Sequence, residues 1–239
     1  MLEIKHVHKI YKDITALQDI SLTLEVGIYA LLGPNGSGKS TFMRILCNQC
    51  KKDQGEVLYD GKDISKNASS YYRDLGYAPQ QQGLYDEFSG ERFLTYMALL
   101  KDIPKDQIQA EVKRVAKSVN MEEHLKKRCK TYSGGMKQRL LVANALLGNP
   151  KILLFDEPTA GLDPKERVSL RNVFERLGKD HILLIATHVV SDVESIADYI
   201  LFLKKGRMIE EASPEVLYKK YQEYQLEEIY LSLFQEEVL

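Results

Sequence analysis

The 239-residue sequence is poor in cysteine and has almost no net charge. Its three cysteines, Cys47, Cys50 and Cys129, suit a reducing cytosol. Cys47 and Cys50 form a C-x-x-C pair, but no second pair of metal ligands accompanies it, so we expect neither a redox nor a metal role there. With 33 basic and 34 acidic residues the formal net charge is −1, so no nucleic-acid partner is expected.

Long apolar runs are missing as well. No stretch of about 18 apolar residues is present, and the first residues do not resemble a signal peptide, so we expect the chain not to span a membrane by itself. There is also no linker, repeat or low-complexity segment. A hydrophobic share of 44 % and a charged share of 28 % are ordinary for a soluble globular protein. We therefore expect one domain over residues 1–239.

The most informative stretch runs from Gly33 to Thr41 and reads G-x-x-x-x-G-K-S, the pattern of a phosphate-binding P-loop. Its glycines let the backbone wrap tightly and point N–H groups at an anion. The apolar residues 28–32 before it predict a buried parallel strand, and residues 39–47 can form a helix whose positive end faces the same phosphates. Lys39 would reach the β- and γ-phosphates, and the Ser40 hydroxyl would hold Mg²⁺. The predicted nucleotide-binding residues are Gly33, Pro34, Asn35, Gly36, Ser37, Gly38, Lys39, Ser40 and Thr41.

Two acidic residues follow a second apolar run, residues 151–155. Asp156 fits the position of an acid that holds Mg²⁺ beside a P-loop. Because like charges oppose joint ionisation, Glu157 beside it suggests a division of labour in which Glu157 polarises the attacking water. A third apolar run ends at His188, which is either a structural histidine or a contact to the γ-phosphate.

A second possible anion site starts at Ser133. Ser133 is a good N-cap, two glycines follow it, and a helix can run from about Met136 to Leu147. The alternative is an ordinary capped helix start. Asp163 is likewise a predicted N-cap, with proline at the first helical position and Glu166 at the third. Ser191 and Glu194 have the spacing of another capping box.

The remaining pattern predicts the fold class, which is α/β. Residues 2–5 and 20–24 alternate as antiparallel strands, residues 75–80 form a short strand ending at Gln80, and residues 91–100 and 105–120 have helical apolar stripes. Residues 199–203 and 208–210 predict a hairpin. We expect a P-loop NTPase core with a mostly parallel central sheet, an N-terminal antiparallel β subdomain and an inserted α-helical subdomain. The expected boundaries are about 1–85 and 150–212 for the core, 86–149 for the helical subdomain and 213–239 for a C-terminal helical extension.

Taken in order, these residues resemble the motifs of the ATP-binding subunit of an ABC transporter, and the resemblance extends over nearly the whole chain. Residues 33–41 are similar to the Walker A motif, and residues 152–157 to Walker B with its catalytic glutamate. Tyr11 lies where the family stacks an aromatic ring on adenine, although by itself it is more readily a packing tyrosine. Further similarities are Gln80 with the Q-loop glutamine, residues 133–139 with the signature, residues 160–163 with the D-loop, and Thr187-His188 with the switch histidine.

The signature departs from the usual Leu-Ser-Gly-Gly-Gln at two positions. Tyr132 replaces the leucine and Met136 replaces the glutamine. The anion-binding Ser-Gly-Gly is kept, so ATP binding is still expected. The Tyr-Ser-Gly-Gly-Met form resembles subunits that serve exporters more than those that serve nutrient importers.

The resemblance implies ATP and Mg²⁺ as cofactors. It implies catalytic roles for Glu157, His188 and Gln80, and an Mg²⁺ site at Ser40, Gln80 and Asp156. In this family two ATP-binding subunits pair head to tail, and each ATP lies between the P-loop of one and the signature of the other. The residues expected to act on the partner's ATP are Ser133, Gly134, Gly135, Met136 and Asp163.

The implied partners are a second ATPase subunit, identical or related, and a membrane-spanning permease. The protein is then expected in the cytoplasm, peripheral on the cytoplasmic face of the membrane, with a contact surface around Tyr85, Phe88 and Phe93. A small-molecule kinase would need an acceptor-binding lid. A related ATPase that acts on DNA or ribosomes is the alternative, and it would usually show coiled-coil heptads or two fused ATPase halves.

Overall fold

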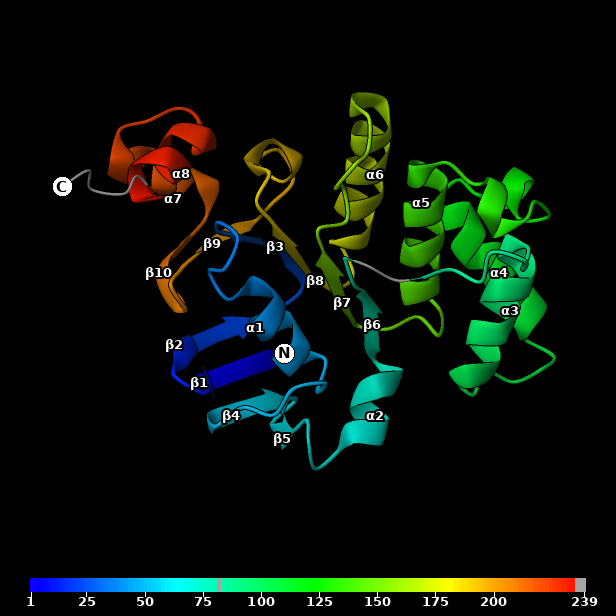
Figure 1. Cartoon of the computed structure of the whole chain (residues 1–239), viewed down its shortest axis with the longest axis horizontal. Helices are drawn as coiled ribbons and strands as arrows, with labels where there is room; N and C mark the ends of the chain where they lie inside the picture. Colours follow the sequence, from blue (N-terminus) through cyan, green and yellow to red (C-terminus); the bar gives the residue numbers. More distant parts are fainter. Residues whose placement is uncertain (81–82, 235–239) are drawn as a thin grey trace.

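The computed structural model describes residues 1–80 and 83–234. Its central sheet has six strands in the order β10-β9-β3-β8-β7-β6 (Figure 1). β6, β7, β8, β3 and β9 are parallel, and β10 runs antiparallel to β9 as the predicted hairpin. Every residue of β3, β7 and β8 is buried, which explains why their sequences are continuous apolar runs. The strands are β3 (Gly27–Leu32), β6 (Leu75–Ala78), β7 (Ile152–Asp156), β8 (Ile182–Thr187), β9 (Tyr199–Lys204) and β10 (Arg207–Ala212).

A smaller antiparallel sheet covers one face of the central sheet together with helix α1 (Lys39–Leu46). Its strand order is β2-β1-β4-β5, so the predicted N-terminal antiparallel region is confirmed. Phe42 and Met43 of α1 lie in the core between the sheets, with Leu154 and Leu184 from the central strands. The strands are β1 (Leu2–Tyr11), β2 (Ile14–Leu24), β4 (Gln54–Tyr59) and β5 (Lys62–Asp63), and a short helix α2 (Ala68–Arg73) leads into β6.

Helices cover the other face, and three of them form a group beside β6 (Figure 1). α5 (Gly134–Ala145) packs against β6, and α3 (Gly90–Leu100) and α4 (Ile108–Ser118) pack against α5 and each other. Phe93 and Val115 are buried, so both predicted apolar stripes reach the core, but Leu100 at the end of the first stripe is 62 % exposed and does not belong to the core. α6 (Pro164–Leu177) places Phe174 on Phe155, with ring centroids 5.0 Å apart. Short 3-10 helices lie at Glu122–His124 and Cys129–Thr131.

The C-terminal helices α7 (Pro214–Tyr221) and α8 (Leu226–Phe234) lie above β9 (Figure 1). Tyr230 and Phe234 of α8 pack on Phe202 of β9 with ring centroids 6.3 and 6.0 Å away. The Lys204 ammonium donates to the Leu233 carbonyl at 2.7 Å. Within the described ranges, no helix combines the length and the apolar composition that crossing a membrane requires.

The predicted capping box at Ser191 and Glu194 is wrong. The chain forms a 3-10 turn, η3 (Val190–Asp192), and no α-helix begins there in the described structure. Glu194 has other partners, since its carboxylate accepts hydrogen bonds from the Tyr218 hydroxyl at 3.1 Å and from the Leu226 N–H at 2.7 Å. Contacts with the C-terminal helices therefore replace the local cap.

Candidate functional site

Four loops leave the same edge of the central sheet, because four neighbouring strands run parallel. They follow β3, β8, β7 and β6, in that spatial order. In the register, Leu32 before the P-loop pairs with Thr187, and Asp156 pairs with Ala186 one residue earlier. The structure therefore brings the P-loop, Asp156-Glu157 and His188 together at the carboxyl edge, where ligands bind in open α/β sheets.

The P-loop enters α1 through Gly38, which is the N-cap of the helix. Gly38 has φ of 112°, a conformation that favours glycine. A Cβ at this position would lie 2.6 Å from the carbonyl oxygen of Ala16. The loop thus wraps closely on the adjoining β2 strand, and the positive end of α1 faces the sheet edge.

Lys39 is buried inside the loop, with 6 % of its surface exposed. Its ammonium donates hydrogen bonds to the carbonyl oxygens of Gly33 at 2.6 Å and Pro34 at 3.2 Å. Burial lowers the pKa of Lys39, while the carboxylates of Glu157 and Asp156 oppose that shift. The ammonium is therefore fixed where an anion held by the loop would meet it.

Asp156 is 4 % exposed, and its Oδ1 has no hydrogen-bond partner among the described residues. Burial raises the pKa of Asp156, and the neighbouring Glu157 raises it further, while the Ser40 hydroxyl and then Lys39 act in the opposite direction. An unpartnered buried carboxylate oxygen beside a hydroxyl fits a Mg²⁺ ion, which prefers oxygen ligands and near-octahedral geometry. No group of three or more His, Cys, Asp or Glu that could hold a metal occurs in residues 1–80 and 83–234. Phosphate oxygens and water would have to supply the other ligands.

Glu157 is held by the end of the neighbouring strand. Its backbone has φ of 50°, an uncommon conformation for a non-glycine residue, and its N–H donates to the Ala186 carbonyl at 2.8 Å. The Thr187 hydroxyl donates to Oε2 at 3.1 Å, and Nδ1 of His188 lies 2.9 Å from Oε1. Thr187 had no role of its own in the sequence prediction, although its place before His188 could have suggested one.

Gln80 is exposed and lies two residues beyond the end of β6. Because Ala78 pairs with Phe155, the chain reaches Gln80 at the same edge as Asp156. The neighbouring residues 81 and 82 are outside the described part of the chain.

Tyr11 is exposed at the end of β1. Its hydroxyl lies 3.1 Å from Sγ of Cys50, and the Lys9 ammonium lies 5.1 Å from the ring centroid. Asp53 pairs with Lys9 at 2.9 Å and accepts from the Ile10 N–H at 2.6 Å, so the loop after α1 holds this strand end. The ring is therefore anchored through its hydroxyl and keeps an exposed surface.

The second predicted anion site lies apart from the first. Ser133 caps α5 by accepting from the Met136 N–H at 3.2 Å, and α5 belongs to the helical group that Figure 1 shows on the far side of β6 from α1. The structure thus leaves Gly134 exposed at the start of an uncovered helix rather than bringing it to Lys39. Gly135 is buried.

Glu166 faces this helix start, which the sequence did not predict. Its Oε1 is 3.4 Å from the Ser133 hydroxyl, and a Cβ on Gly135 would overlap the same carboxylate. Asp163 caps α6 as predicted, accepting from the Glu166 N–H at 2.8 Å. The Glu166 side chain, however, turns away from its own helix toward the signature.

Tyr132 explains one departure from the usual signature. Its side chain is buried, and its hydroxyl donates to the His124 carbonyl at 2.8 Å. A Cβ on Gly90 would overlap the Tyr132 hydroxyl, so the start of α3 and the tyrosine fit each other. The larger side chain therefore anchors the signature within the helical group.

Comparisons with known proteins agree with this geometry. The family model described as ABC transporter matches residues 17–160. The ABC transporter ATP-binding protein NatA of Bacillus subtilis is 30 % identical, over 92 % of this chain and 91 % of its own. The lantibiotic transport ATP-binding protein SrtF of Streptococcus pyogenes is 33 % identical, over 87 % of this chain and 89 % of its own.

Solved structures give the same result. The dimeric form of a bacterial ABC transporter cassette is 26 % identical and superposes with a TM-score of 0.81, over 90 % of this chain and 99 % of that one. The same cassette in a post-hydrolysis state bound to ADP and Pi has a TM-score of 0.79 over the same shares of the two chains. With its P-loop NTPase fold and these relatives, the chain belongs to the ABC transporter family, as an ATP-binding subunit.

Proposed function

We propose that the chain hydrolyses ATP as one half of a head-to-tail pair and that this cycle drives a membrane-spanning partner. The observation that carries the proposal is the division of the predicted residues into two places. Lys39, Asp156, Glu157 and His188 gather at one sheet edge, whereas Ser133 opens a helix elsewhere on the surface. A second copy can supply Ser133 to a nucleotide that the first copy holds.

The P-loop binds the phosphates of ATP. Its backbone N–H groups and Lys39 meet the negative charge, and Tyr11 stacks on adenine. Ser40, Asp156 and Gln80 would hold Mg²⁺, which would supply positive charge to the phosphates. Asp156 Oδ1, which has no hydrogen-bond partner within residues 1–80 and 83–234, supports this assignment.

Glu157 accepts a proton from the attacking water. Thr187 and His188 hold its carboxylate with contacts of 3.1 and 2.9 Å, so its position is set before the water arrives. The His188 side chain also contacts the γ-phosphate. Loss of that phosphate removes the group that the two subunits share, and the pair then weakens.

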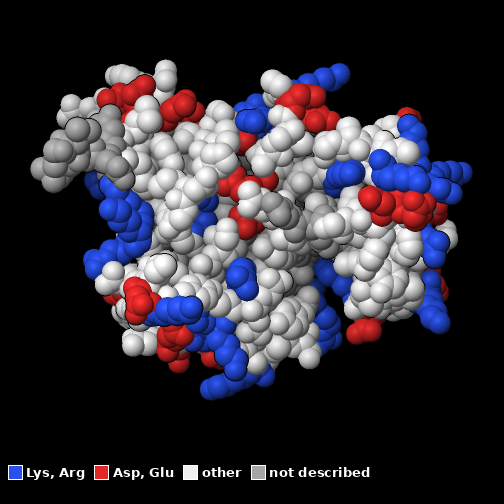
Figure 2. Space-filling view, viewed as in Figure 1, with Lys and Arg blue, Asp and Glu red and all other residues white. Residues whose placement is uncertain are grey.

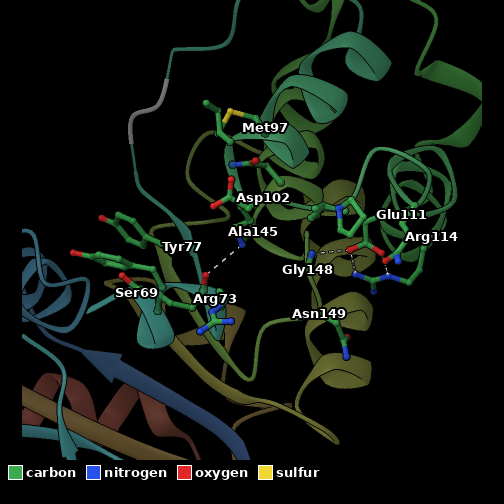
Figure 3. Close-up of a pocket in the computed structure, with 18 of the residues that line it drawn as sticks. Ser69, Arg73, Tyr77, Met97, Asp102, Glu111, Arg114, Ala145, Gly148 and Asn149 are labelled. Atoms are coloured by element: carbon green, nitrogen blue, oxygen red, sulfur yellow. Dashed lines mark hydrogen bonds and ion pairs between the residues drawn. The ribbon is translucent and has the colours of Figure 1, made fainter. Parts of the chain in front are cut away.

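The partner-facing surface includes a groove of about 1490 Å³ between the core and the helical group (Figure 3). Figure 2 shows the notch between these parts, with basic side chains in and below it. Lys101 lies in the groove wall and donates to the carbonyls of Leu75 at 3.3 Å and Leu147 at 2.8 Å, so it joins the end of α3 to β6 and to the segment after α5. The charged lining residues are of both signs, and Arg114 pairs with Glu111 at 2.7 Å; they are Arg44, Arg73, Lys101, Arg114, Asp102, Asp106 and Glu111.

Apolar side chains continue from the groove along α3. Met97 and Leu100 line it, and Tyr85, Phe88 and Tyr96 form an aromatic cluster with ring centroids 5.0 to 6.2 Å apart. Phe93 is buried in the core and is therefore not available to a partner. A cytoplasmic amphipathic helix of a membrane protein, with its apolar face toward Met97, Leu100 and the aromatic cluster, fits this surface.

We further propose export as the direction, from the Tyr-Ser-Gly-Gly-Met form of the signature, and a location on the cytoplasmic face of the membrane. The division into a core over about 1–85 and 150–212, a helical subdomain over about 86–149 and a C-terminal extension over 213–239 is part of the same proposal. Movement of the helical subdomain would carry the groove with it, because α3 and α4 form one wall.

Co-expression with a candidate permease tests the proposal. The protein should fractionate with membranes only when the permease is present, and Leu100→Glu or Tyr85→Glu should abolish this while basal ATPase stays within about threefold, as surface changes usually allow. Val216→Glu, an equally exposed apolar site on α7, is the matched control. Membrane binding without any permease, or binding that survives both groove variants, would contradict the assigned surface.

A further inference from the structure

A buried polar bridge lies behind the contact between Glu157 and His188. Thr159, which is 2 % exposed, donates its hydroxyl hydrogen to Oδ2 of Asp192 at 2.5 Å, and Asp192 is 4 % exposed. Thr159 lies two residues after Glu157, and Asp192 lies four residues after His188. The two loops that carry the proposed chemistry are thus joined a second time, through buried side chains.

Helix α6 completes the bridge. Nη1 of Arg167 lies 3.6 Å from Oδ1 of Asp192, and Nε of the same residue donates to the Leu162 carbonyl at 3.1 Å. One turn further along α6, Nη1 of Arg171 donates to the Ser191 carbonyl at 2.9 Å. A single guanidinium therefore contacts both the turn η3 and the segment that leads to Asp163.

Stability alone is a weak reason for this arrangement. A buried carboxylate loses its hydration, and replacing a buried ion pair by apolar side chains of similar volume is often neutral or stabilising. The groups around Asp192 do, however, fix one relative position of two loops. One loop carries His188, and the other carries Asp163 at the start of α6.

We infer that Asp192 is a positioning residue that couples the switch loop, residues 188–192, to the segment 159–163. When His188 meets the γ-phosphate, the bridge sets the place of Asp163 for the partner subunit. ATP bound to one subunit thereby places Asp163 of that subunit in the position that pairing with the second subunit requires. This inference rests on the proposed function and goes beyond it, because no resemblance assigned a role to Thr159, Arg167 or Asp192.

The test uses two conservative variants of the full chain in a Glu157→Gln background. Asp192→Asn keeps the size and an oxygen acceptor for Thr159 but loses the charge that faces Arg167, and Thr159→Val keeps the shape but loses the donor. Both should weaken ATP-driven dimerisation about 5- to 150-fold, the usual range of coupling between sites. ATP affinity of the monomer, measured by calorimetry in dilute solution, should stay within about twofold, because neither residue reaches the nucleotide.

Asp63→Asn is the matched control. The Ser65 hydroxyl donates to Asp63 at 2.5 Å and the Lys52 ammonium lies 4.0 Å from the same carboxylate, so the same charge is removed from the same kinds of contact, but in the N-terminal sheet. This variant should dimerise like its parent. The double variant of Thr159 and Asp192 should lose less than the sum of the two single effects, since both belong to one bridge.

Several outcomes would overturn the inference. Unchanged dimerisation in both variants would do so, and so would a parallel loss of monomer ATP affinity, which a purely structural role predicts. If Asp192→Asn fails to fold, as judged by circular dichroism, Thr159→Val carries the test alone. A Glu157→Gln parent that never dimerises with ATP would contradict the proposed function itself and the inference with it.

Discussion

Helix α1 follows a glycine and helix α5 begins with two glycines, and each presents an N-terminus to a possible anion, yet the two starts are built differently. α1 begins at Gly38, without a side-chain cap in the described structure, and its first residue, Lys39, is buried among the loop carbonyls. α5 begins at Ser133, whose hydroxyl caps the helix, and Gly134 is exposed. The N-terminus of α1 is therefore enclosed by the P-loop, whereas the N-terminus of α5 is exposed to solvent.

The charges around the two starts differ in the same way. Asp156 and Glu157 stand near Lys39 and mark a place where phosphate, metal and water can be assembled. At α5 the Glu166 carboxylate lies 3.4 Å from the Ser133 hydroxyl, so an acid stands at a positive helix end. This difference supports the proposal that α1 binds a ligand of its own subunit and that α5 binds the ligand of a second subunit.

The largest effect should come from Lys39→Ala, because this change removes the cation inside the first start. ATP binding to the monomer, measured by calorimetry, should be lost. Lys51→Ala, an exposed lysine just after α1, is the control and should bind like the unmodified protein. Unchanged affinity in a folded Lys39→Ala protein would show that the P-loop lysine does not meet the phosphates.

Glu157→Gln should come next, as it leaves both helix starts intact and removes only the proton acceptor. Loss of a general base typically lowers the rate about 10²–10⁴-fold, while ATP affinity should be kept. Steady-state phosphate release measures this, with Glu175→Gln on the exposed side of α6 as the control for the loss of one charge. Hydrolysis at the unmodified rate would remove Glu157 from the mechanism.

Ser133→Arg tests the role of the exposed N-terminus of α5. Monomer ATP affinity should be unchanged, because Ser133 is expected to act on the partner's nucleotide. Hydrolysis should fall about 10²-fold or more, as when a transition-state hydrogen-bond donor is removed. An active Ser133→Arg protein would contradict a site shared between two subunits.

The smallest effect should come from Glu166→Gln. The amide keeps the shape but loses the negative charge that faces the α5 N-terminus. The γ-phosphate of ATP bound to the partner subunit would then no longer compete with a carboxylate there. ATP-driven dimerisation in the Glu157→Gln background should strengthen about two- to fivefold, the usual size of a charge effect at a helix end. Weaker dimerisation would show that Glu166 helps the partner's ATP instead of competing with it.

The sequence predicts those parts of the site that depend on local chemistry. The P-loop, Asp156-Glu157 and His188 each follow a buried strand, and parallel strands bring their carboxyl ends to one edge. The central sheet, the N-terminal antiparallel sheet and the core stripe with Phe93 follow from periodicity in the same way.

The parts that escaped prediction depend on contacts between distant segments. Nothing near Asp192 in the sequence points to Thr159, which lies 33 residues earlier, and nothing near Glu166 points to Ser133. The failed capping box has the same cause, because the partners of Glu194 are in α7 and α8. A polar side chain can form its hydrogen bonds with a local cap or with a distant segment. The spacing of residues in the sequence does not show which of these the tertiary fold selects.

The central claim is that each nucleotide site needs the α1 start of one subunit and the α5 start of another. Light scattering of the Glu157→Gln protein during gel filtration tests it most directly. The account predicts a dimer with Mg-ATP, a monomer without nucleotide, and a monomer under both conditions once Ser133→Arg is added. A protein that stays monomeric with Mg-ATP, or a dimer that survives Ser133→Arg, would contradict it.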